Sequence, residues 1–261
     1  MRTVERLSLY HRRAARPKGD DRPRRRGCSP LAPAWQNAVM RTLHHLPLCP
    51  FARKVRILLA EMALDCELEA EPVWERRDGF LVLNPAGEVP VLVEEDGTAI
   101  VDSTVICEYL CEVYGGGELL GGDPAWRAEI RRIAAWFDLK FHREAGRLIL
   151  DEKIDKRFLA RGAPDSAVLR RGIRALRPHL DYLGWLTRDQ GWLAGEMFTL
   201  ADIAAAAHLS CIDYLGDVPW DDYPAARAWY ARARQRPSMR AVLADHVPGL
   251  PPARGYRGGP G

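Results

Sequence analysis

Four consecutive residues, Cys49-Pro50-Phe51-Ala52, place a thiol where a strand meets a helix. Alternating apolar and polar residues over 41–46 predict the strand, and an apolar stripe over 55–62 predicts the helix. Pro50 suits the first helical turn, where its missing N–H is not needed. The thiol of Cys49 therefore lies at a helix N-terminus, where free N–H groups and the helix dipole favour a thiolate or a bound anion. This chemistry indicates a reactive site or the remnant of one.

The other cysteines point to a reduced protein. Position 52 is alanine, so the motif lacks the resolving cysteine of a two-thiol redox cycle. No metal is expected, because the remaining cysteines lack the paired spacing of a zinc site. They are Cys28, Cys66, Cys107, Cys111 and Cys211. Their apolar surroundings favour reduced thiols in the cytoplasm, and Cys107 and Cys111, four residues apart, are expected to be buried side chains rather than a redox pair.

The elements that position the thiol follow one order. Residues 40–114 pattern as strand, helix, strand, short irregular helix, two strands and helix, with Asp96-Gly97 as a hairpin turn. This βαβ–ββα order predicts a thioredoxin-like α/β domain. A glycine-rich linker over 115–124 follows, and residues 125–246 show only helical periodicity. The fold class is therefore α/β plus all-α, a thioredoxin-like domain followed by a helical domain.

Both ends of the chain differ from this globular pattern. Residues 1–39 carry ten Lys/Arg against three Asp/Glu and lack sustained periodicity. They are expected to be a misassigned upstream extension of a chain that starts at Met40, or else a disordered basic arm that touches nucleic acid or lipid. Residues 247–261 are rich in proline and glycine, which predicts an extended or disordered tail.

Charge and apolar content exclude two classes of function for this chain. The net charge is +3, but residues 40–126 are acidic and residues 127–261 are basic. No nucleic-acid partner is expected, because the part from Met40 onward is net negative and carries no reader motif. No apolar run approaches the roughly 20 residues of a membrane helix, so no transmembrane segment is expected.

Three further motifs carry a resemblance. Val89-Pro90 precedes a strand, where thioredoxin-like domains hold a cis-proline, and Asp102-Ser103 begins a helix whose N–H groups could bind a carboxylate. Thr199 and Asp202 are spaced as a helix capping box. With Cys49, these motifs over residues 40–246 resemble cytosolic glutathione transferases. The resemblance implies a glutathione site at Cys49, Val89, Pro90, Asp102 and Ser103, with Cys49 as the nucleophile if the protein is an enzyme, and no other cofactor.

Five segments resemble a narrower group, the transferase-like proteins of alphaproteobacteria that bind filaments of the division tubulin FtsZ. The segments are residues 46–56, 74–77, 84–93, 135–138 and 208–220. This resemblance implies a cytoplasmic homodimer at the division site that acts as a scaffold. A glutathione or thiol transferase that uses Cys49 is the alternative.

The residues expected to contact a partner combine an aromatic anchor with positive charge. They are Trp74, Arg76, Arg77, Arg131, Arg132, Arg143 and Arg147. Tryptophan and arginine dominate interface hot spots, and a basic face could steer an acidic partner such as FtsZ. Two alternatives remain open. The Trp74 ring could fold back onto the protein, and the arginines could form an ordinary solvated face.

Overall fold

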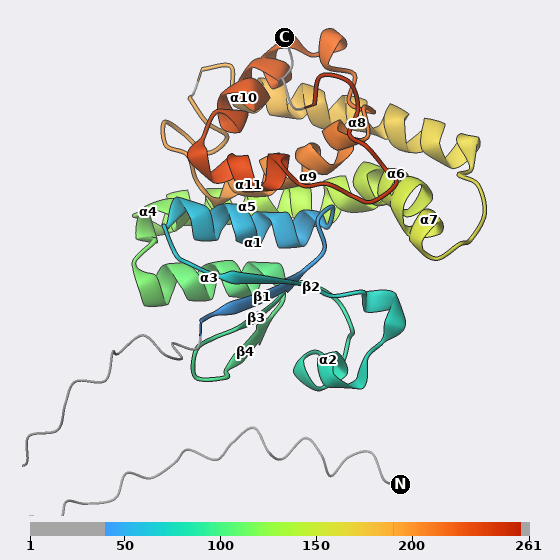
Figure 1. Ribbon diagram of the computed structural model, residues 1–261. Helices are drawn as coiled ribbons and strands as arrows, with labels where there is room; N and C mark the ends of the chain where they lie inside the picture. The colour runs from blue at the N-terminus through green and yellow to red at the C-terminus, as the bar shows by residue number, and fades with distance from the viewer. Residues whose placement is uncertain (1–39, 190, 257–261) are drawn as a thin grey trace, which may run out of the picture. The chain divides into compact units, whose positions relative to one another are not determined.

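A computed structural model describes residues 40–189 and 191–256 (Figure 1). The expectations for residues 1–39 and for the last five residues lie outside these ranges. Within them, no helix combines the length and the apolar character needed to cross a lipid bilayer.

The first half is built on a four-stranded sheet with the order β2-β1-β3-β4. The strands are β1 Thr42–His45, β2 Glu67–Ala70, β3 Val91–Val93 and β4 Ala99–Val101. β1 pairs in parallel with β2, and the pairs β1–β3 and β3–β4 are antiparallel. The predicted thioredoxin-like order of elements is confirmed.

Helices cover both sides of this sheet. α1 (Pro50–Glu61) and α3 (Ser103–Tyr114) lie on the side of the helical half, whereas α2 (Asp78–Leu83) lies on the other side (Figure 1). A 3-10 turn, η2 (Val73–Glu75), joins β2 to α2. The expected irregular helix is therefore two short helical segments.

The second half is entirely helical. It starts with a continuous helical run of α5 (Pro124–Ala135), the π-helix η3 (Trp136–Gly146), α6 (Arg147–Leu150), the π-helix η4 (Asp151–Asp155) and α7 (Lys156–Phe158). The later elements are α8 (Ser166–Leu186), α9 (Leu200–Tyr214), η5 (Trp220–Asp222), α10 (Pro224–Arg234), η6 (Pro237–Met239) and α11 (Arg240–Leu243). Every residue of α9 except Asp213 is buried, which makes it the central helix of this half.

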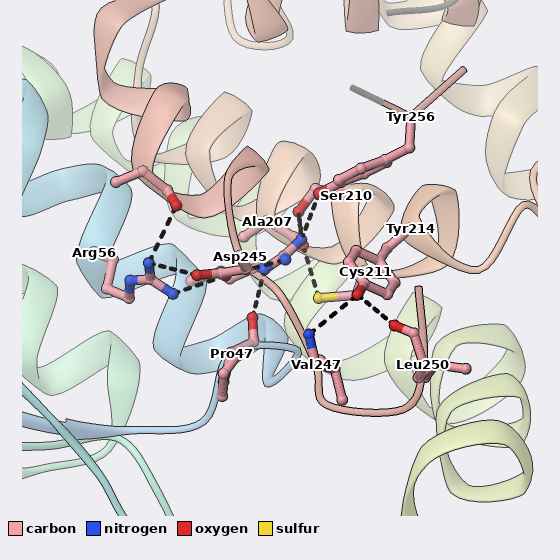
Figure 2. A network of polar contacts seen from close by, with 12 residues as sticks. Pro47, Arg56, Ala207, Ser210, Cys211, Tyr214, Asp245, Val247, Leu250 and Tyr256 are labelled. Atoms are coloured by element: carbon pink, nitrogen blue, oxygen red, sulfur yellow. Dashed lines mark hydrogen bonds and ion pairs between the residues drawn. The ribbon is translucent and has the colours of Figure 1, made fainter. Parts of the chain in front are cut away.

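Two segments differ from the expectations. The predicted linker over 115–124 contains a short helix, α4 (Gly117–Leu120), because Leu120 is buried against the core. The described part of the predicted tail is packed rather than extended or disordered. Val247 and Tyr256 are each 3% exposed, and the Tyr214 hydroxyl donates to the Leu250 carbonyl at 2.6 Å (Figure 2). The segment is rich in proline and glycine, but the buried side chains of Val247 and Tyr256 anchor it to the core.

Candidate functional site

The sheet register brings the predicted glutathione-site residues to one edge. His44 on β1 pairs with Val91 on β3, and Val91 pairs with Val101 on β4. Cys49 follows the end of β1, Val89-Pro90 precedes β3, and Asp102 follows β4, so all three segments leave the sheet at the same edge. The peptide bond between Val89 and Pro90 is cis, as the thioredoxin-like pattern predicts.

Cys49 begins α1, but its thiol is not activated. It is half-buried, and its Sγ donates a long, weak hydrogen bond to the Val89 carbonyl at 3.8 Å. Burial raises the pKa of Cys49 to about 12, although the N–H groups of Ala52 and Phe51 favour the thiolate. Of the two sequence interpretations, a reactive site or its remnant, this raised pKa favours the remnant, because desolvation outweighs the helix N-terminus.

Asp102 is the cap of α3. Its Oδ1 accepts the N–H groups of Thr104 at 2.8 Å and Val105 at 3.1 Å. Its φ of 73° lies in the left-handed region that favours glycine, and such strain clusters at ligand sites. Ser103 is buried beside it. Asp102 therefore works as a structural cap with a left-handed backbone.

A buried arginine holds the loop that carries Cys49. Arg53 on α1 is fully buried, and its Nε donates to the Pro47 carbonyl at 2.7 Å. The same guanidinium bonds to Ser210 at 2.8 Å, Tyr256 at 3.2 Å and Asp245 at 3.1 Å, in the network of Figure 2. The loop before the thiol is thus tied to both α9 and the C-terminal segment.

A second buried network joins the two halves beside the site. Lys54 on α1 is fully buried and its Nζ lies 2.5 Å from Asp138 on η3. His208 on α9 contacts the other oxygen of Asp138 at 3.2 Å, and Thr104 accepts from Lys54 at 3.1 Å. Burial alone would raise the pKa of Asp138, but His208 and Lys54 outweigh it and hold the pKa below its usual value. This ion pair fixes α1 against the helical half.

The Trp74 ring meets a partner from the helical half. It stacks on Phe158 of α7 with the ring centroids 5.3 Å apart and the planes 10° apart. Both side chains stay 39% exposed. The ring is therefore folded against the protein yet keeps an apolar surface in solvent, which combines the two sequence interpretations. We call this pair the aromatic rim.

The predicted basic residues are partly neutralised. Five of the six predicted arginines have an acidic partner: Arg77 with Glu71 and Glu69, Arg131 with Glu108, Arg132 with Glu129, Arg143 with Glu144 and Arg147 with Asp151. Arg76 has a left-handed backbone, and its guanidinium lies against Gly87.

The basic residues also spread along the helical run. Arg132 lies at most about 39 Å along it from Phe158 at 1.5 Å per residue, whereas Arg147 lies at most about 17 Å from Phe158. Arg147 is therefore much closer to the aromatic rim along the run than Arg132.

The predicted capping box at α9 is present. Oδ2 of Asp202 accepts the N–H of Thr199 at 3.1 Å, while Oδ1 accepts Nε1 of Trp229 at 2.9 Å and the N–H of Leu193 at 3.0 Å. Burial raises the pKa of Asp202 to about 6, although these hydrogen-bond donors act to lower it. Its role is to hold the start of the central helix.

One group of side chains in the described ranges has the composition of a cation site. Ligand atoms of His44, Glu69 and Glu71 lie within 4.8 Å of one another. The Arg77 guanidinium donates to both oxygens of Glu71, so a positive charge is already supplied there.

The comparisons with known proteins agree with this geometry. Residues 43–118 match the model of the glutathione S-transferase N-terminal domain, and residues 169–237 match the C-terminal domain. The crystal structure of a glutathione S-transferase from Rhodospirillum rubrum F11 is 52% identical in sequence to this chain and superimposes on it with a TM-score of 0.82. The match covers 84% of this chain and 98% of the chain in that crystal structure. The chain belongs to the glutathione S-transferase family.

Within this family, one relative carries a more specific name. FtsZ-localized protein A of Caulobacter vibrioides is 49% identical over 84% of this chain and 97% of its own length. The solved structure of FzlA from C. crescentus, also 49% identical, superimposes with a TM-score of 0.81 over 98% of its chain. The narrower resemblance drawn from the five sequence segments is thereby confirmed.

Sequence reasoning missed the residues that join the halves. Lys54, Asp138 and Phe158 have partners 84 residues distant in the chain, which no local pattern identifies. Arg53 and Lys54 did carry one signal. They lie beside the apolar stripe of α1, where a charged side chain needs a buried partner.

Proposed function

We propose that this protein is a non-catalytic scaffold with the glutathione transferase fold, which binds FtsZ filaments at the division site in the cytoplasm and promotes cytokinesis. The observation that carries the proposal is the 49% identity with FtsZ-localized protein A over 97% of that relative. Fold alone would not favour it, because one fold hosts many functions.

The chemistry of the cleft supports a scaffold. Thiol transfer needs a thiolate, and a pKa of about 12 keeps Cys49 protonated at neutral pH. The buried Lys54–Asp138 pair and the Arg53 network meanwhile hold α1 and the loop before Cys49 in place. In this proposal the glutathione-site residues Cys49, Val89 and Asp102 maintain the fold and do not take part in catalysis.

The aromatic rim supplies the docking surface in this proposal. Trp74 and Phe158 offer a stacked apolar face, and stacked aromatic side chains lose little conformational entropy on binding. Arg143 and Arg147, with side chains 73% and 66% exposed, lie on the same helical run and add positive charge for an acidic filament.

Co-sedimentation with FtsZ filaments tests the proposal. We expect the wild-type protein to pellet with filaments, and we expect Trp74→Ala to raise the apparent Kd at least about 10-fold, as for an interface hot spot. Val82→Ala is the matched control, because Val82 is 80% exposed on α2 but outside the stack. If the wild type stays in the supernatant, or if both variants bind equally, the proposal is wrong.

Glutathione transfer is the second candidate function. The cis Val89-Pro90 bond and the φ of 73° at Asp102 preserve a peptide-holding geometry at the same sheet edge as Cys49. Glutathione would then be the ligand or substrate. Calorimetric titration with glutathione, compared between wild type and Cys49→Ser, tests this function. Tight binding with thiol transfer that disappears in the variant would favour the enzyme over the scaffold.

The proposal includes a homodimer. Val105 on α3 and Leu139 on η3 are 54% and 66% exposed, and the Arg131–Glu108 pair at 2.7 Å joins α5 to α3. Apolar side chains this exposed mark contact sites when they gather on one face. Sedimentation velocity at micromolar concentration is expected to show a dimer that Leu139→Asp dissociates. A monomeric wild-type protein would contradict this part of the proposal.

A further inference from the structure

Unpaired positive charge lies on α8 and just after it, outside the region predicted from the sequence. Arg170 and Arg174 on α8 and Arg188, two residues past its end, are exposed, and within residues 40–189 and 191–256 none of their guanidinium groups makes an ion pair or hydrogen bond. Arg177 is only weakly paired, 3.9 Å from Asp222. These four arginines differ from Arg131 and Arg147, whose acidic partners lie within hydrogen-bond distance.

Three of the four arginines lie on one face of α8. The spacings of four and three residues between Arg170, Arg174 and Arg177 return to nearly the same angle around a helix of 3.6 residues per turn, and Arg188 follows the end of α8 and lines the groove described next. The opposite face of α8 carries the buried Leu176 and Leu183. We call Arg170, Arg174, Arg177 and Arg188 the α8 arginine stripe.

An aromatic groove lies at the end of this stripe. Trp185 is 59% exposed and, by helical spacing, follows the same face of α8. It lines an open groove of about 540 Å³ between α8 and α10. At Gly184 the two helices approach closely, since a Cβ there would lie 3.4 Å from the Cβ of Ala225. A volume of this size is in the range of sites that hold small ligands or an apolar side chain.

We infer that the α8 arginine stripe and the Trp185 groove form a docking site for an acidic protein segment that carries one apolar anchor residue. The stripe supplies sites for carboxylates, and the groove accepts the anchor beside Trp185. The inference does not depend on the proposed function, because the aromatic rim is made by η2 and α7 rather than by α8 and α10.

The acids beside the stripe favour a peptide over a uniform polyanion. Asp181 lies on the stripe face, and both Asp181 and Asp222 line the groove. These carboxylates would repel the evenly spaced charges of a nucleic acid or an anionic membrane, whereas a peptide can place a neutral or basic residue opposite them. A second copy of the chain is disfavoured, because a two-fold contact would set the stripe against itself.

The spacing of the stripe defines a probe. Arginines four residues apart on a helix are separated by about 6 Å, close to the roughly 6.7 Å between alternate residues of an extended peptide. Trp185 lies about 12 Å beyond Arg177, which about four extended residues span. The matching probe is a synthetic peptide with three glutamates at alternate positions and one leucine four positions past the last glutamate.

Fluorescence anisotropy of the labelled peptide with the full chain tests the inference. We expect saturable 1:1 binding that weakens with salt. The double variant Arg170→Glu with Arg174→Glu is expected to raise the Kd at least about 10-fold, and Trp185→Ala about 5-fold. A peptide with serine in place of leucine is expected to lose affinity for the wild type but no further affinity for Trp185→Ala, because the two changes remove one contact.

Matched controls separate this site from general charge attraction. Arg143→Glu with Arg147→Glu changes the net charge equally and is expected to leave the Kd within about 2-fold. Circular dichroism checks that each variant is folded. The inference is overturned if the wild type does not bind the peptide, or if the control pair weakens binding as much as the α8 pair. It is also overturned if the serine peptide binds as well as the leucine peptide, or if single-stranded DNA or phosphatidylglycerol vesicles bind more tightly than the peptide.

Discussion

The cleft at Cys49 and the aromatic rim at Trp74 leave the sheet at the same edge but differ in chemistry. The segments around Cys49 have a cis Val89-Pro90 bond and a left-handed Asp102 backbone, and burial raises the pKa of the thiol to about 12. The rim carries no catalytic group, but it leaves two stacked rings in solvent. In the proposed function, the fold preserves the backbone around an unreactive thiol, while a neighbouring surface contacts the partner.

The largest expected effect concerns the ion pair on which both regions depend. Asp138→Ala leaves the buried Lys54 with the Thr104 hydroxyl but without an acidic partner, so the free energy of unfolding is expected to fall by about 3–5 kcal/mol. The double variant Lys54→Met with Asp138→Leu removes both charges and is expected to recover most of the loss. Urea denaturation measures both. If the double variant is as unstable as the single one, the charge argument is wrong.

A change in the helical cap should alter stability without affecting the cleft or the rim. The pKa of Asp202 is about 6 in the folded protein, above its ordinary value of 3.8, so the folded state binds more protons between these values. Stability from this group is therefore present below about pH 4 and lost as the pH rises through 6, by about 3 kcal/mol in total. Asp202→Asn is expected to flatten that part of the pH profile, measured by urea denaturation from pH 4 to 7. An unchanged profile would contradict the raised pKa.

The thiol of the cleft should be unreactive. A pKa of about 12 in place of 9.0 lowers the thiolate fraction about 1,000-fold at pH 7, and the greater nucleophilicity of a more basic thiolate recovers part of it. Alkylation of Cys49 by iodoacetamide is expected to be about 50-fold slower than that of a free thiol, followed by peptide mass spectrometry. Labelling in urea provides the control. Fast labelling of the folded protein would restore the enzyme hypothesis.

The smallest expected effect is a difference in filament binding between variants of two basic residues, Arg147 and Arg132. Arg147→Glu is expected to weaken FtsZ co-sedimentation about 3-fold at low salt, while the loss of its exposed pair with Asp151 costs at most about 1 kcal/mol of stability. Arg132→Glu, far along the helical run from the rim, serves as the control and is expected to have no effect on binding. Equal losses in the two variants would mean that the filament contacts a broader basic face.

The sequence predicted the elements better than the site. Periodicity, Pro50 and the capping box of Thr199 and Asp202 are local signals, and the structure has the corresponding helices. The protonation of Cys49 depends on burial by distant segments, which no local pattern contains. The same reason hid the Trp74–Phe158 stack and the packing of Tyr256. Counts of basic residues along the sequence also could not identify which arginines lack an acidic partner, because ion pairs form between side chains that the fold brings together.

The most direct measurement compares Cys49→Ser with Trp74→Ala in one co-sedimentation experiment with FtsZ filaments. If the rim is the functional surface and the cleft is architectural, Cys49→Ser is expected to pellet like the wild type, whereas Trp74→Ala is expected to remain largely in the supernatant. Loss of pelleting in Cys49→Ser together with full pelleting of Trp74→Ala would contradict the account.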